Sequence, residues 1–227
     1  MKSLVFDTGP VITLAMNNLL WTLEFLKTRF EGRFYIPDSV KFELIDKPLE
    51  SKKYKLEAIM VDNLISTGSL EVYSKLDVDH LMEHVNNIFI SNNKPIYILD
   101  RAEVEALALA LRLQSGAYVV DERTMRLLIE DPKSLKRILE KKVHRPIDVN
   151  EKLLKDFQYM TKGLKVVRSC DLMVLAYELG LFNKYINKVH NDKTFLDGLL
   201  WGLRLRGCGI SEDEIEKIIG YEIKRNR

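Results

Sequence analysis

The sequence predicts an α/β fold in which a parallel sheet of four or five strands is covered by helices on both faces. Short apolar runs alternate with longer stretches of helical periodicity, as in parallel sheets whose strands are buried on both sides. Two of these runs are directly followed by an aspartate: Asp7 follows residues 3–6, and Asp121 follows residues 117–120. Ligands in such folds meet the carboxyl ends of the strands. We therefore expect both acids at one edge of the sheet.

Five short apolar runs are expected to be strands because they are too short for buried helices and are bounded by turn residues. Gly9-Pro10 follows the first run, Gly32 precedes the second, Gly116 precedes the fourth and Gly163 precedes the last. The expected strands cover residues 3–6, 34–36, 70–73, 117–120 and 164–167.

The stretches between these runs have the apolar spacing of helices. Asp38 or Ser39 is expected to cap the helix after the second strand, and Ser211 with Glu214 fits a capping box. Asp131-Pro132 should interrupt a long helical stretch. One helix is expected to begin at Pro37-Asp38, and the others cover about 11–15, 19–30, 51–67, 77–91, 99–114, 122–161, 170–180, 193–206 and 211–223.

Length and composition indicate one globular domain. The chain has 227 residues, 46% of them hydrophobic, which is ordinary for a folded protein. We expect a single domain over 1–227, with expanded helical segments at about 48–96 and 129–162 and a helical part at 169–227. The N-terminus does not resemble a secretory signal, and no apolar run reaches about 18 residues, the length needed to span a membrane. Cys170 and Cys208 are expected to be buried thiols, and the protein is expected to be cytoplasmic.

The formal net charge of +2 does not by itself indicate a nucleic-acid-binding protein. Basic residues nevertheless gather in three places, which could contact nucleic acid or be solvated helix faces and a soluble tail. These clusters are Lys133, Lys136 and Arg137; Lys141, Lys142, His144 and Arg145; and Lys224, Arg225 and Arg227.

Several acids follow strands or lie near helix N-termini, which face the same way in a βαβ unit, so they can converge. An acid directly after a buried strand is costly unless it is used or capped. Acids such as Glu103 and Glu122 could instead only stabilise a helix dipole. The six candidate residues are Asp7, Glu43, Glu103, Glu105, Asp121 and Glu122.

Such a cluster is typical of a divalent-cation site, because several carboxylates at close range repel one another unless a cation lies between them. Mg²⁺ and Mn²⁺ prefer carboxylate oxygen and water ligands. No His or Cys lies among the six positions, which disfavours zinc. A cation held in this way can activate water and neutralise charge on a phosphodiester.

Four segments resemble motifs of the PIN-domain family, in the order and spacing of that family. Each places an acid after an apolar strand or in the helix that follows. Residues from Gly163 to Gly180 are similar, more loosely, to the closing segment of one PIN subgroup. The four segments are Val5-Phe6-Asp7-Thr8-Gly9-Pro10, Ile36-Pro37-Asp38-Ser39-Val40-Lys41-Phe42-Glu43, Glu103-Val104-Glu105-Ala106-Leu107-Ala108-Leu109-Ala110 and Val119-Val120-Asp121-Glu122-Arg123.

The resemblance implies a three-layer α/β/α fold and a metal-dependent endoribonuclease that uses Mg²⁺ or Mn²⁺. It implies Asp7, Glu43, Glu105 and Asp121 as the catalytic, metal-binding set. Two further metal-binding or outer-shell acids would be Glu103 and Glu122, and Thr8 would hydrogen-bond the carboxylate of Asp7. The implied substrate is single-stranded or structured RNA, with an antitoxin protein or a second copy as open partners and no membrane.

Alternatives of other classes remain. Within the ribonucleases, the chain could be a toxin of the VapC type or an RNA-processing nuclease, and its length favours processing. A non-catalytic RNA-binding or scaffold protein with the same fold is the second class. His80 and His84 lie one helical turn apart without an evident third zinc ligand. Asp7-Thr8-Gly9 lacks the second acid of the Asp-x-Asp pattern in haloacid-dehalogenase-like phosphatases.

Overall fold

The computed structural model describes residues 2–186 and 191–225, and a parallel sheet lies at its centre. Within these residues the sheet has five strands in the order β3-β2-β1-β6-β8, and every neighbouring pair is parallel. The prediction of four or five parallel strands is therefore confirmed. The strands are β1 (Ser3–Phe6), β2 (Arg33–Pro37), β3 (Glu71–Tyr73), β6 (Ala117–Val119) and β8 (Val166–Val167).

The strand order reverses between β1 and β6. From β1 the chain proceeds outward to β2 and β3, and it then returns to place β6 and β8 on the other side of β1. Phe6 pairs with Val119, so the carboxyl ends of β1 and β6 lie side by side. Ligands of open α/β sheets bind at such a reversal point. Asp7 and Asp121 follow these two strand ends, as expected from the sequence.

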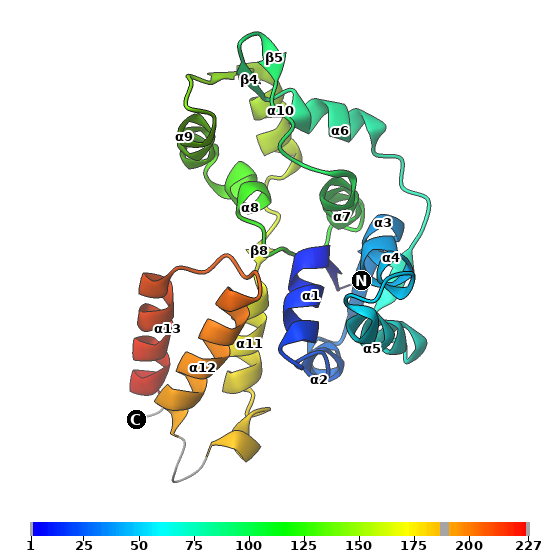
Figure 1. Ribbon diagram of the computed structural model, residues 1–227, viewed down its shortest axis with the longest axis vertical. Helices are drawn as coiled ribbons and strands as arrows, with labels where there is room; N and C mark the ends of the chain where they lie inside the picture. The colour runs from blue at the N-terminus through cyan, green and yellow to red at the C-terminus, as the bar shows by residue number, and fades with distance from the viewer. Residues whose placement is uncertain (1, 187–190, 226–227) are drawn as a thin grey trace.

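Helices cover the sheet in a three-layer arrangement. Helix α7 packs against β1, β2 and β6, while α1 packs against α5 and α11. In the view of Figure 1, α11, α12 and α13 lie below β8, and α6, α8, α9 and α10 lie above it. The α-helices are α1 (Thr8–Met16), α2 (Thr22–Phe30), α3 (Asp38–Lys41), α4 (Lys47–Leu49), α5 (Lys55–Ser66), α6 (Asp79–Asn86), α7 (Arg101–Arg112), α8 (Arg123–Glu130), α9 (Pro132–Val143), α10 (Glu151–Met160), α11 (Ser169–Glu178), α12 (Asp192–Leu205) and α13 (Glu212–Arg225).

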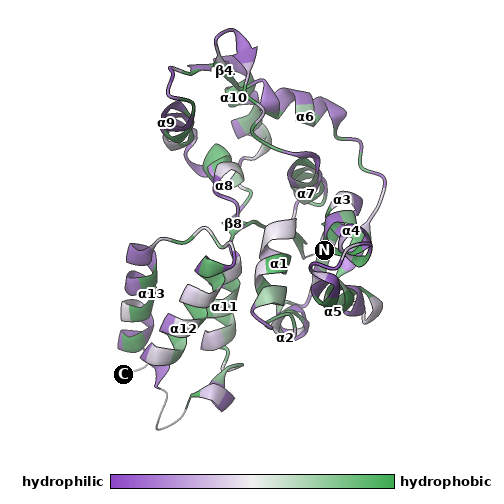
Figure 2. Ribbon diagram, in the orientation of Figure 1, coloured by the Kyte–Doolittle hydropathy of each residue, from purple (hydrophilic) through white to green (hydrophobic). Residues whose placement is uncertain are grey.

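The first strand is held by burial on both faces. Val5 and Phe6 are fully buried, and the ring of Phe6 lies 5.2 Å from that of Phe34 on the neighbouring strand. Burying one such side chain contributes about 2 kcal/mol. The hydropathy colouring in Figure 2 shows apolar residues on α1, α7 and α11. This rigid core fixes the strand end from which Asp7 projects.

A small second sheet corrects two expectations. The helix expected over 77–91 ends at Asn86, and the helical stretch expected over 122–161 is interrupted by a strand. The reason is a hairpin at Asn92-Asn93, whose two positive φ values of 51° and 60° suit a tight turn between antiparallel strands. This antiparallel sheet has the order β5-β4-β7, formed by β4 (Phe89–Ser91), β5 (Lys94–Pro95) and β7 (Asp148–Val149).

The helix after β2 begins differently from the expectation. Its N-cap residue is Pro37, not Asp38 or Ser39. The carboxylate of Asp38 instead accepts hydrogen bonds from the hydroxyl of Ser74 and the backbone N–H of Lys75. Helix α3 then continues through a π-helical turn, Phe42–Asp46, into α4. Such turns are rare and often occur at functional sites.

Several other expectations are confirmed. Ser211 and Glu214 form the expected reciprocal cap of α13, with the Ser211 N–H donating to the Glu214 carboxylate at 2.8 Å. Asp131 caps α9, which has Pro132 at its start. Cys170 and Cys208 are free, buried thiols.

Two features complete the description of the chain. Among the described helices, none is long and apolar enough to cross a bilayer. Arg227 of the last basic cluster lies outside the described residues.

Candidate metal and catalytic site

Asp7 lies at the carboxyl end of β1, where the chain turns into α1. Its backbone N–H donates to the carbonyl oxygen of Val119 at 2.9 Å, which ties the end of β1 to that of β6. The side chain is only 4% exposed. Its Oδ1 atom is buried without a hydrogen-bond partner among the described residues. An unpartnered buried carboxylate oxygen is costly, so this atom is free to accept a ligand.

The surroundings of Asp7 disfavour its ionised form. Burial raises the pKa of Asp7 to about 7, whereas the backbone N–H groups of Thr8 and Gly9 lower it. The negative charges of Asp100 and Glu43 raise it further. A carboxyl group so strongly perturbed at a strand end is typical of a functional site.

Glu103 is a second acid with a raised pKa, and it shares the site with Asp7. Burial raises the pKa of Glu103 to about 8, and the negative charges of Asp100, Asp7 and Glu122 raise it as well. The hydrogen bond from the backbone N–H of Asp100 has the opposite effect and lowers it. Glu103 and Asp100 form a capping box at the start of α7. The Asp100 N–H donates to the Glu103 carboxylate at 2.8 Å, and the Glu103 N–H donates to Asp100 at 3.0 Å.

Asp100 was not among the residues predicted from the sequence. The signal was present, because an Asp three residues before a Glu at the start of a helical stretch is a capping pattern. The cap turns the Glu103 carboxylate toward the N-terminus of α7 and places a further negative charge beside Asp7.

Glu43 joins the same group from the π-helical turn after α3. Its carboxylate accepts a hydrogen bond from the hydroxyl of Thr8 at 2.7 Å. Thr8 was expected to bond the carboxylate of Asp7, but its side chain reaches Glu43 instead. Its backbone N–H, together with that of Gly9, lowers the pKa of Asp7. Thr8 thus contacts both Asp7 and Glu43 and connects the end of β1 to the π-helical turn.

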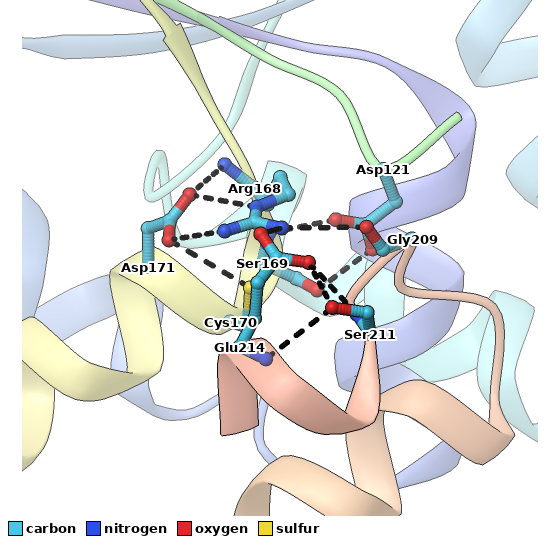
Figure 3. A network of polar contacts seen from close by, with 8 residues as sticks. All are labelled: Asp121, Arg168, Ser169, Cys170, Asp171, Gly209, Ser211 and Glu214. Carbon is cyan, nitrogen blue, oxygen red and sulfur yellow. Dashed lines mark hydrogen bonds and ion pairs between the residues drawn. The ribbon is translucent and has the colours of Figure 1, made fainter. Parts of the chain in front are cut away.

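Asp121 is held beside Asp7 by groups from α11. The Ser169 N–H and hydroxyl donate to the two carboxylate oxygens of Asp121, each at 2.7 Å, and Asp121 is 2% exposed. Figure 3 shows this pair within a larger polar network. A Cβ at Gly9 would lie 3.6 Å from the Cβ of Asp121 and 3.7 Å from Oδ2 of Asp7, so Gly9 lies between the two acids.

Arg168 joins this pair to the C-terminal helices (Figure 3). Its guanidinium contacts the carboxylates of Asp171 and Glu214 at 3.2 and 3.0 Å and donates to the Gly209 carbonyl at 3.3 Å. Burial lowers the pKa of Arg168, but its bonds to these acids raise it above the usual value. Gly209 also donates to the Asp121 carbonyl at 3.2 Å, where a Cβ would come within 2.7 Å of that oxygen.

The structure places Glu105 away from this group, on the other side of α7 from Glu103. Its buried carboxylate accepts hydrogen bonds from the Ser39 N–H at 3.2 Å and from the Arg101 guanidinium at 2.9 Å. It therefore caps α3, the helix that leads to Glu43. The last predicted acid, Glu122, is exposed and caps α8 by accepting from the Met125 N–H at 2.9 Å.

The arrangement as a whole brings Asp7, Glu43, Glu103 and Asp121 to the point where the sheet order reverses. Within residues 2–186 and 191–225, no three His, Cys, Asp or Glu side chains converge closely enough to hold a metal ion as they stand. Of the two histidines one helical turn apart, His84 contacts the Leu153 carbonyl at 2.8 Å. The donor set at the acidic group consists of oxygens, and it includes the free Oδ1 of Asp7. This chemistry fits a hard divalent cation.

Comparison with known families identifies the family of the chain. Residues 3–131 match the family model described as DUF3368, a PIN domain. The match contains β1, β2, β3 and β6 and all six acids predicted from the sequence. No curated protein and no solved structure matched the chain. PIN domains have a nuclease-type fold and generally depend on divalent metals. Since the match covers more than half of the chain, the protein belongs to the PIN-domain family.

Proposed function

We propose that this protein is a metal-dependent endoribonuclease that hydrolyses phosphodiester bonds of RNA at the acids around Asp7. The observation that carries the proposal is the raised pKa of two neighbouring carboxyls, about 7 for Asp7 and about 8 for Glu103. Burial and neighbouring negative charges both disfavour the ionised form of these acids, which is costly unless a cation compensates them. Membership of a nuclease-type family supports the same reading.

Asp7, Glu43 and Glu103 are the acids that we propose to hold Mg²⁺ or Mn²⁺, with Asp121 and Glu122 beside them. The charges of Glu43 and Glu122 reach this group, since they raise the pKa of Asp7 and Glu103 respectively. When bound, the cation supplies Lewis-acid stabilisation of the negative charge that builds on the phosphodiester. The acids would move together on binding it, because like charges stand apart without a counter-ion.

Other residues are proposed to position these acids. Glu105 fixes the start of α3 through Ser39, and α3 leads directly to Glu43. Ser169 fixes both oxygens of Asp121. We therefore propose that Glu105, which the family resemblance put in the metal set, acts instead through Glu43. Sites of this kind need supporting groups, because misplaced ligands lose affinity for the metal.

The biological role is proposed to be RNA processing rather than that of a toxin, although an antitoxin or a second copy of the chain remain candidate partners. The chain extends well beyond the family match at residue 131, and β8 from this extension completes the sheet by pairing with β6. Since β8 belongs to the same sheet, we propose that the whole chain forms one domain.

A cleavage assay tests the proposed function. Labelled single-stranded and hairpin RNAs are incubated with the protein in Mg²⁺, Mn²⁺ or EDTA, and products are separated by size. We expect internal cleavage with either metal and none in EDTA. Asp7→Asn should slow cleavage at least about 100-fold, because it removes a charge from the centre of the site. Asp197→Asn, at an exposed position of α12, is the matched control. Equal cleavage by the parent and Asp7→Asn would refute the proposal.

A further inference from the structure

The strongest concentration of positive charge lies on α9 and the turn after it. Residues 132–146 contain six Lys or Arg side chains and one acid, Glu140, which gives a net charge of +5. The whole chain carries only +2, so the remaining residues carry a net charge of −3. This segment therefore has an excess of positive charge, while the acids outnumber the basic residues in the rest of the chain. Figure 2 shows hydrophilic residues along α9.

Three of these cations form a stripe along one face of α9. Lys133, Arg137 and Lys141 follow one another at intervals of four residues, about 6 Å along the helix axis, and all three are exposed. No acid of the described residues forms an ion pair with any of them within 4.0 Å. Like charges at this spacing disfavour a helix by about 0.2–0.5 kcal/mol per pair. A bound polyanion would remove that penalty.

The stripe ends in a hollow. His144 has a positive φ of 53°, which turns the chain and brings Arg145 to the side of Arg137 and Lys141. The one acid here, Glu140, is already engaged, since its carboxylate accepts from the Ile147 N–H at 3.2 Å. The hollow has a volume of about 520 Å³ and is lined by Arg137, Glu140, Lys141, His144, Arg145 and Pro146.

A short helix connects this hollow to the acidic site. Helix α8 begins after its cap Glu122, next to Asp121, and packs against α9. Its eight residues span about 12 Å. It carries Arg123 and Arg126, which continue the positive charge toward the acids. In Figure 1, α8 lies between β8 and α9.

From this placement we propose that the α9 hollow binds the phosphate backbone of single-stranded RNA outside the cleavage site. The inference rests on the proposed nuclease function and adds the surface that holds the substrate. Lys and Arg contacts to phosphate give affinity without reading the sequence. An acidic site repels a polyanion, so a separate basic surface is needed to hold RNA beside it.

The test is RNA binding measured by fluorescence anisotropy in EDTA, over a range of salt concentrations. The triple variant Arg137→Gln, Lys141→Gln and Arg145→Gln is compared with the parent. The control removes the same charge from exposed residues of α2, α12 and α13 by Arg29→Gln, Lys193→Gln and Lys217→Gln.

The triple variant should bind about 100-fold more weakly at 0.1 M salt, and its log–log salt slope should fall by about 2, since each phosphate contact contributes about 0.7. The control should stay within about twofold of the parent. Equal binding by the two triple variants would overturn the proposal, as would a parent that does not bind RNA. Tighter binding of polyglutamate than of RNA would assign the hollow to an acidic protein and would also overturn it.

Binding without metal separates this inference from the nuclease proposal. A parent that binds RNA through α9 but cleaves none with Mg²⁺ or Mn²⁺ would refute the nuclease proposal and leave the RNA-binding surface supported. A parent that cleaves RNA, together with a triple variant that binds as the parent does, would refute only the α9 surface.

Discussion

Replacing Asp7 with Asn should stabilise the metal-free protein, and the gain should grow with pH. The pKa of Asp7 is about 7 in the folded protein against 3.8 for an unperturbed Asp. The folded state therefore binds this proton more tightly than the unfolded chain, so stability falls as the pH rises from about 4 to about 7. A difference of about three pKa units corresponds to about 4 kcal/mol, which is fully lost above pH 7. Because Asn cannot ionise, the Asp7→Asn variant does not lose this stability as the pH rises.

The gain from Asp7→Asn should therefore be about 4 kcal/mol at pH 8 and about 2 kcal/mol at pH 5. Any unpaired amide hydrogen of the Asn side chain lowers both gains equally. The difference of about 2 kcal/mol between the two pH values is independent of that cost. Urea denaturation in EDTA at pH 5 and pH 8 measures it, with Asp197→Asn as control. A gain that is the same at both pH values, or a loss that grows toward pH 8, would refute the account of Asp7.

Three further outcomes follow from the supporting groups. Ser169→Ala removes the hydroxyl bond to Asp121 and should destabilise the protein by about 2 kcal/mol in urea; an unchanged midpoint would contradict that bond. Glu105→Ala should cost about 2 kcal/mol by leaving the Ser39 N–H without its acceptor, and should weaken cleavage less than Asp7→Asn. The pKa of Glu214 is lowered to about 2, although burial alone would raise it, because of its bonds from Ser211 and Arg168. Its stabilisation is present above pH 4.5 and lost toward pH 2, so Glu214→Gln should lower the melting temperature at pH 6 more than at pH 3.

The sheet and the positions of Asp7 and Asp121 could be predicted because both rest on local patterns. A buried strand needs only a short apolar run, and parallel strands bring their ends to one edge. The reversal between β1 and β6 then places the two acids side by side. These features depend on burial and backbone direction, which the apolar pattern encodes.

The family resemblance placed Glu105 rather than Glu103 in the metal set, and the apolar pattern of the sequence offers no independent ground for that choice. Two positions apart on a helix, their side chains point about 200° apart around the axis. Which of them meets Asp7 depends on how α7 is rotated against the sheet. The capping box of Asp100 and the hydrogen bond from the Ser39 N–H of α3 to Glu105 fix that rotation.

Hydrogen-bond partners that lie far apart in the sequence also could not be predicted. Ser169 lies 48 residues from Asp121, and its small polar side chain carries no signal that it would hold a distant carboxylate. The hairpin at Asn92-Asn93, by contrast, does have a local signal in the sequence, because two residues that tolerate positive φ lie between apolar positions. The helical spacing of the preceding apolar residues predicted a helix there instead.

The central claim is that a divalent cation binds at Asp7 and Glu103, and a calorimetric titration with Mn²⁺ tests it most directly. Glu103→Gln and Glu105→Gln remove the same charge two residues apart on α7, so each serves as the control for the other. We expect Glu103→Gln to weaken Mn²⁺ binding at least about 10-fold, and Glu105→Gln to weaken it less, because Glu105 acts only through the position of Glu43. Parent-like binding by Glu103→Gln, with binding abolished in Glu105→Gln, would contradict the account.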